Sequence, residues 1–372
     1  MTSPTKHSPY GPSGADRWMS CPGSISLIER FTKQFGETPP SPAAEEGTRA
    51  HEIAAKALLS GKPPKEALAE IPNVPEDWID PLLVYLDAVT VGRELISDPN
   101  DFRVEAWRQW DEDPRIAGTA DCICRAGNVL IVSDLKFGIG KFVDARSMQL
   151  SIYAFLALQD YPEVETVVQR IVQPRWRGTA EKVREVTYSA ADLQKAVSEA
   201  LRAALREVDE NPHKFHMGSH CEWCPAQSIC PEQRADLTRI LTMQDQKNDI
   251  QYIDFVLKKE KQITNIIASA KKAAKRLLLD GGNLPDWELI ETRGRQRWSQ
   301  ESADVEQALL AEGFPYSQIC PAKLATPAQL RKKINNTELL ESLTVRDTVV
   351  KIVRRRQEEA QESAAAFADE EV

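Results

Sequence analysis

The sequence predicts an α/β fold in which helices flank a mixed central sheet. Two apolar runs, at residues 116–124 and 129–132, border a turn around Gly127, which is the pattern of an antiparallel hairpin. A helical segment at residues 145–158 then leads to another β-branched run at residues 164–173. That order fits a right-handed crossover if the two strands are parallel.

The other elements follow from apolar periodicity and from the Pro- and Gly-rich segments between them. Residues 43–59 are Ala-rich and helical, and they place His51 beside Ala54 and Leu58 on an apolar face. Further helices are expected at residues 76–96, 190–208 and 249–279, with strands at residues 102–110 and 183–188. After Gly281-Gly282, short helices are expected near residues 305–312, 327–334 and 336–343. Residues 287–298 read as a strand or hairpin, and residues 344–354 as either a strand or a helix.

Charged residues gather at one end of the central hairpin. Counting back from the turn places Asp121, of Gly118-x-x-Asp121, across from about Asp134. Lys136 shares a face with Asp134, because side chains repeat every second residue along a strand. Neighbouring carboxylates repel each other unless a cation relieves the repulsion, and Mg²⁺ or Mn²⁺ is the natural partner of oxygen ligands. A solvated surface hairpin would also carry an isolated Asp-x-Lys, but here the charges end an apolar strand.

This pattern resembles the core of the PD-(D/E)XK nuclease superfamily, in its RecB-like and CRISPR-associated exonuclease-like branch. The resemblance covers residues 15–232 and includes an upstream His51 and a downstream Gln149-x-x-x-Tyr153. The family more often has Glu where Asp134 stands. The resemblance implies a restriction-endonuclease-like fold and metal-dependent hydrolysis of DNA, with the following roles. His51, Asp121 and Asp134 would be metal ligands. Lys136 would position or activate the attacking water. Gln149 and Tyr153 would orient the scissile strand.

Three of the seven cysteines are clustered as Cys221-x-x-Cys224 and Cys230. This spacing is typical of a metal or cluster site, and three thiolates need a fourth ligand. His216 or His220 could complete a zinc site. The family resemblance implies instead a [4Fe–4S] cluster whose fourth ligand is the distant Cys21. The other cysteines, Cys122, Cys124 and Cys320, are expected to be ordinary residues.

The sequence also bears on domains and partners. Residues 1–14 are expected to be disordered, residues 15–232 to form the nuclease domain, residues 233–356 a helical extension of unknown role, and residues 357–372 an acidic disordered tail. The net charge of −9 argues against a whole-surface nucleic-acid binder but leaves room for a local basic groove. A lysine-rich helix at residues 258–276 and the group Arg170, Arg175, Trp176 and Arg177 are candidates for DNA contacts.

No apolar run approaches the ~20 residues of a membrane span, so a cytoplasmic protein without membrane contact is expected. The layout, including Arg17-Trp18-x-x-Cys21-Pro22, is similar to a family of unassigned activity found in bacteriophages and prophages. DNA, and phage recombination or single-strand-binding proteins, are then the implied partners. Two alternatives stay open: a catalytically silent DNA-binding recombination scaffold, and a zinc-stabilised interaction module.

Overall fold

A computed structural model describes most of the chain. The described residues are 8–37, 40–93, 96, 98–242, 249–300, 302–319, 326–331, 333–334 and 336–354. The chain divides into two compact units, Met1–Ser269 and Ala270–Val372. Of the segments predicted to be disordered, residues 1–7 and 357–372 lie outside the described residues. Residues 8–14 are ordered instead, because the Ser8 hydroxyl donates to Arg115 O at 2.6 Å and Pro12 is buried. Cys320 also lies outside the described residues.

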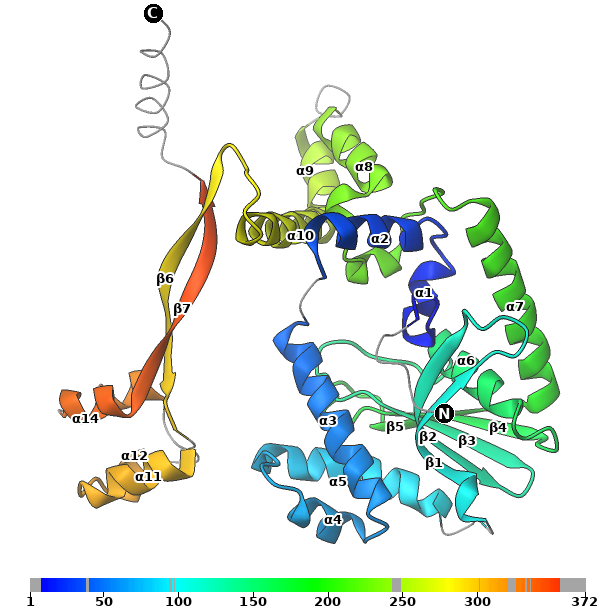
Figure 1. The fold of residues 1–372 in the computed structure, drawn as a ribbon, viewed down its shortest axis with the longest axis horizontal. Helices are drawn as coiled ribbons and strands as arrows, with labels where there is room; N and C mark the ends of the chain where they lie inside the picture. The colour runs from blue at the N-terminus through cyan, green and yellow to red at the C-terminus, as the bar shows by residue number, and fades with distance from the viewer. Residues whose placement is uncertain are drawn as a thin grey trace, which may run out of the picture. The chain divides into compact units, whose positions relative to one another are not determined.

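The first unit is built on a five-stranded sheet with the order β1-β2-β3-β4-β5 (Figure 1). Its strands are β1 Phe102–Gln109, β2 Ala117–Ala126, β3 Val129–Leu135, β4 Thr166–Val172 and β5 Val183–Ser189. Neighbouring strands are antiparallel except β3 and β4, which are parallel and joined through helix α6 (Met148–Leu158). The predicted α/β fold with a mixed sheet is therefore confirmed, including the hairpin and the parallel pairing of the strands on either side of α6.

Helices cover both faces of the sheet (Figure 1). On one face, α3 (Pro42–Leu59), α4 (Pro64–Glu70) and α5 (Glu76–Arg93) share an apolar core with Cys122, Leu135 and Val172 of the strands. On the other face, α6 and α7 (Ala190–Glu210) pack with α1 (Ala15–Trp18) on the opposite sides of the same strands. Serine side chains cap three of these helices by accepting a hydrogen bond from a backbone N–H: Ser41 for α3, Ser147 for α6 and Ser189 for α7.

The end of the first unit differs from the prediction of one long helix at residues 249–279. The structure has α9 (Asp249–Lys258) and α10 (Glu260–Leu279), and α10 crosses the boundary between the two units. The break falls at Lys259, whose ammonium group reaches a buried carboxylate, Asp236 of α8 (Pro231–Thr242), at 3.0 Å. Lys259 is thus fixed by a tertiary ion pair at the position where helical periodicity alone predicts that one helix continues.

The second unit contains a two-stranded antiparallel sheet of β6 (Trp287–Trp298) and β7 (Thr344–Arg354). Residues 344–354 are therefore a strand, whereas the sequence alone left a strand and a helix as alternatives. The described residues between these strands include the short helices α11 Ser302–Ala311, α12 Tyr316–Ile319, α13 Pro327–Leu330 and α14 Thr337–Ser342. Val305, Leu309 and Leu330 belong to their buried core. Among the described helices of the chain, none has the length and apolar character that crossing a membrane requires.

Candidate functional site

The hairpin register brings the predicted carboxylates to one end of the sheet. Cys122 pairs with Ser133, so the next pair of residues along the two strands is Asp121 and Asp134. The backbone N–H of Leu135 donates a hydrogen bond of 2.7 Å to Asp121 Oδ2. This bond fixes the Asp121 carboxylate by the main chain of the neighbouring strand.

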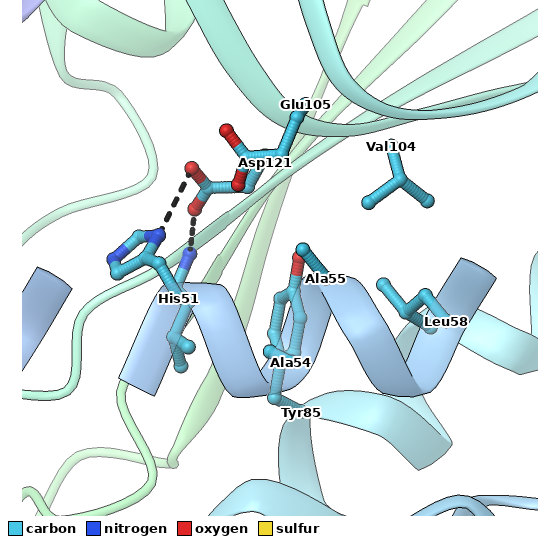
Figure 2. Close-up of a pocket in the computed structure, with 9 residues that line it drawn as sticks. His51, Ala54, Ala55, Leu58, Tyr85, Val104, Glu105 and Asp121 are labelled. Atoms are coloured by element: carbon cyan, nitrogen blue, oxygen red, sulfur yellow. Dashed lines mark hydrogen bonds and ion pairs between the residues drawn. The ribbon is translucent and has the colours of Figure 1, made fainter. Parts of the chain in front are cut away.

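His51 meets Asp121 from helix α3. Its Nδ1 lies 3.2 Å from Asp121 Oδ1, and Figure 2 shows the imidazole turned toward that carboxylate. Burial alone would lower the pKa of His51. The hydrogen bond and charge of Asp121, with the charge of Asp134, outweigh burial and raise the pKa to about 9. Without a cation, the imidazolium therefore neutralises part of the negative charge.

Glu105 is a further member of the site, and the sequence alone left it undecided between a structural and a supporting role. It lies on β1 between Val104 and Ala106, which pair with residues on either side of Asp121. Figure 2 shows its carboxylate beside that of Asp121. The ligand atoms of His51, Glu105 and Asp121 all lie within 4.8 Å of one another. Burial, and then the charge of Asp121, raise the pKa of Glu105.

The backbone of Glu105 is strained, since its φ of 50° lies in the left-handed region that non-glycine residues rarely adopt. Such outliers persist where the surrounding structure holds them, and they gather at functional sites. Glu105 belongs to no motif in the sequence. The only signal that could have found it is the register of β1, which places it opposite Asp121.

A second group of side chains surrounds Asp134, whose side chain is only 3% exposed. Lys136 Nζ lies 2.9 Å from Asp134 Oδ2, and it donates a 3.0 Å hydrogen bond to Gln149 Oε1 of α6. The Gln149 amide in turn donates to Asp134 Oδ1 at 3.2 Å. Burial raises the pKa of Asp134, while Lys136 opposes that change. Burial would lower the pKa of Lys136, but the charge of Asp134 raises it overall, so the group stays an ammonium.

Tyr153, predicted to orient substrate, is 8% exposed and belongs to the core beneath the site. It packs against Gly118, where an added Cβ would lie 2.9 Å from the tyrosine ring. Burial raises the pKa of Tyr153, and a hydrogen bond with Gln149 opposes this. Its contacts in the structure are therefore with Gly118 and Gln149, and its role toward substrate stays a prediction.

The four predicted cluster ligands converge although they are distant in sequence. Cys21, Cys221, Cys224 and Cys230 line one recess. His216 and His220 line the same recess. Backbone bonds join the two segments, with the Gly23 N–H donating to Lys214 O at 2.9 Å. Burial raises the pKa of Cys224 to about 11.

The sequence was also compared with known protein families. Residues 7–358 match the family described as "Protein of unknown function (DUF2800)". The chain belongs to the DUF2800 family.

The donor set of this DUF2800 protein fits a hard divalent cation. Carboxylate oxygens and an imidazole are ligands that Mg²⁺ and especially Mn²⁺ accept. Glu105 and Asp121 face each other across neighbouring strands, an arrangement that destabilises the fold unless a cation relieves it. Asp134 Oδ2 is buried and accepts no well-aligned hydrogen bond from any described residue, despite its short approach to Lys136. The site thus offers carboxylate oxygens that a cation could use.

Proposed function

We propose that this protein is a divalent-cation-dependent nuclease that hydrolyses DNA, acting as an exonuclease on ends or single strands. One observation carries the proposal. Asp121 and Asp134 lie at the ends of neighbouring strands, where Asp121 contacts His51 of α3 and Asp134 contacts Gln149 of α6. These groups come from separate segments and match, position by position, the pattern that resembles PD-(D/E)XK nucleases. Phage DNA recombination, repair or replication is the process in which that resemblance would place the activity.

Each residue can be given a role. His51, Glu105 and Asp121 would hold the cation, with Asp134 as a further ligand on the side of Lys136. A bound divalent cation would polarise the phosphodiester and lower the pKa of the attacking water.

The raised pKa of Lys136 bears on its role. An ammonium group held between Asp134 and Gln149 can orient water and stabilise negative charge that develops on the phosphate. Its proposed role is therefore to position the attacking water and to stabilise that charge.

We further propose that the four cysteines hold a [4Fe–4S] cluster, with zinc as the alternative. The sulfurs surround a recess together with Arg17, which donates a hydrogen bond to Ser24 at 3.1 Å. Burial lowers the pKa of Arg17, while Cys224 and Cys21 oppose that change. A guanidinium in this position would offset the negative charge of four thiolates around a cluster.

The nuclease proposal is tested with an isosteric substitution. Asp134→Asn removes one buried carboxylate, and we expect hydrolysis of labelled single- and double-stranded DNA in Mn²⁺ to fall by about 10²-fold or more. The matched control is Asp80→Asn, an exposed carboxylate on α5, which should keep wild-type activity. Circular dichroism checks that both variants are folded. Equal hydrolysis by wild type and Asp134→Asn would refute the proposal.

A further inference from the structure

Two loops meet at the end of the sheet that carries Asp134 and Lys136. One follows β3 (residues 137–147) and the other joins β4 to β5 (residues 173–182). They start side by side, because the Lys136 N–H donates to Val172 O at 2.8 Å. Gln173 is 1% exposed and ties the loops together by donating to Lys141 O at 2.6 Å and accepting from the Val143 N–H at 3.3 Å. The loops are thus held in one arrangement.

Three aromatic residues lie on these loops and on the neighbouring cysteine segment: Phe142, Trp176 and Trp223, which we call the aromatic platform. The Phe142 and Trp176 ring centroids are 5.5 Å apart at 59°. Phe142 is 40% exposed and Trp223 is 64% exposed, which is unusual for side chains that gain by burial. Lys141 of the first loop lies over the Trp223 ring at 5.7 Å and so connects Trp223 to the other two.

The aromatic platform is interleaved with positive charge. Residues 137–147 and 173–184 together hold six Lys or Arg residues against two acidic residues, in a chain whose net charge is −9. The Arg184 guanidinium lies 4.6 Å from the Phe142 ring centroid. It also donates to Val143 O at 2.8 Å, so it is part of the loop framework. Lys141 is exposed and lies over the Trp223 ring, and Arg177, which follows Trp176 in the sequence, is exposed as well.

The loop that carries Trp176 is tied to segments that carry candidate site residues. The Arg175 guanidinium, next to Trp176, lies 4.7 Å from the ring centroid of Phe137, the residue after Lys136. Arg175 also pairs with Glu46 of α3 at 2.7 Å, on the helix that carries His51. The aromatic platform is therefore held next to the segments that carry Lys136 and His51.

We infer that the aromatic platform binds single-stranded nucleic acid, by stacking unpaired bases on Phe142 and Trp223 while nearby cations contact the phosphates. The inference rests on the proposed function and specifies its substrate. Aromatic faces flanked by cations suit unpaired bases, because every base presents a π-face and every nucleotide a phosphate. A duplex keeps its bases stacked on each other and offers no such face to the rings. A protein partner is the competing occupant.

The test measures binding apart from cleavage. Phe142→Ala/Trp223→Ala removes the two most exposed rings and leaves the half-buried Trp176 in place. Fluorescence anisotropy with labelled oligodeoxythymidylate, in buffer without added divalent cation so that hydrolysis is prevented and the metal of the cysteine recess is kept, should show affinity weakened by about 10- to 100-fold. Affinity for a blunt duplex should change little. Trp287→Ala, a 38% exposed tryptophan in the second unit, is the matched control and should bind as wild type.

Salt dependence separates stacking from general charge. The double aromatic variant should keep the wild-type slope of log affinity against log salt, whereas Lys141→Ala/Arg177→Ala, which removes two cations, should reduce the slope by roughly 1.4. Wild-type affinity of the aromatic variant for the oligonucleotide, or an equal loss for single strand and duplex, would overturn the inference. If the aromatic variant binds normally but Asp134→Asn stops hydrolysis, single-strand binding by the aromatic platform is refuted and the nuclease proposal is supported. If binding falls as expected but the wild type hydrolyses no DNA, the nuclease proposal is refuted and binding by the aromatic platform is supported.

Discussion

At the scale of single residues, the candidate site is a set of charges that balance only in part. Glu105 and Asp121 approach each other across β1 and β2, and His51 compensates them by staying protonated. Asp134 is compensated separately by Lys136 and Gln149. Two carboxylates therefore share one imidazolium, and a divalent cation could replace that proton with a larger charge.

His51 gives a pH dependence whose sign follows from its pKa. The pKa is about 9 in the fold and near 6.5 in the unfolded chain, so protonation favours the fold. This stabilisation is fully present below pH 6.5 and is lost as the pH rises toward 9. We expect the free energy of unfolding of metal-free protein to fall across that range by on the order of 2 kcal/mol more than in His51→Gln. Urea unfolding at several pH values measures it, and parallel curves for the two proteins would contradict it.

At the scale of elements, the site depends on close contact between β2, the N-terminal segment and α6. Gly118 begins the Gly-x-x-Asp pattern, and its packing explains the glycine. An added Cβ would lie 2.7 Å from Pro12 Cδ and 2.9 Å from the Tyr153 ring. The glycine thus allows α6, which carries Gln149, to approach the strand that carries Asp121.

Gly118→Ala should therefore destabilise the protein by about 1–3 kcal/mol through overpacking, and should weaken activity by displacing α6. Gly138→Ala is the control, because its added Cβ would meet nothing within 4 Å. Thermal unfolding compares the two. Equal melting temperatures would show that the contact at Gly118 is not required.

Sequence reasoning reached the parts of the fold that local rules determine. The turn at Gly127 and the two-residue strand period place Asp121 opposite Asp134, and the structure has that register. The role of Glu105 was left undecided because it depends on a strained φ and on pairing with a strand that comes later in the chain. The end of α9 before Lys259 was missed because a tertiary ion pair with Asp236 holds it. Neither feature leaves a periodic signal.

At the scale of the whole molecule, the cysteine recess brings together the beginning of the first unit and a segment about 200 residues later in the chain. Cys21 meets Cys221, Cys224 and Cys230 although about 200 residues separate them, and the sheet and its helices lie between. A metal cluster at this recess would cross-link a very long loop of the unfolded chain. It would also fix the segment that carries Trp223 of the aromatic platform.

Cys21→Ser should therefore abolish the cluster's visible absorbance in anaerobically purified protein. It should also lower the free energy of unfolding by on the order of 3 kcal/mol. Wild type stripped of metal should match the variant. Metal analysis with absorbance distinguishes the two candidates, since a colourless protein with stoichiometric zinc would refute the iron–sulfur assignment. Unchanged stability after metal removal would show that the recess does not cross-link the unit.

The most direct measurement is anomalous diffraction from crystals soaked in Mn²⁺. We expect a peak in contact with His51, Glu105 and Asp121, with Asp134 adjacent, and we expect the peak to be lost in Asp121→Asn. A Mn²⁺ peak elsewhere, or none at these residues in crystals of a folded and cation-saturated protein, would contradict the metal centre on which the proposed nuclease depends.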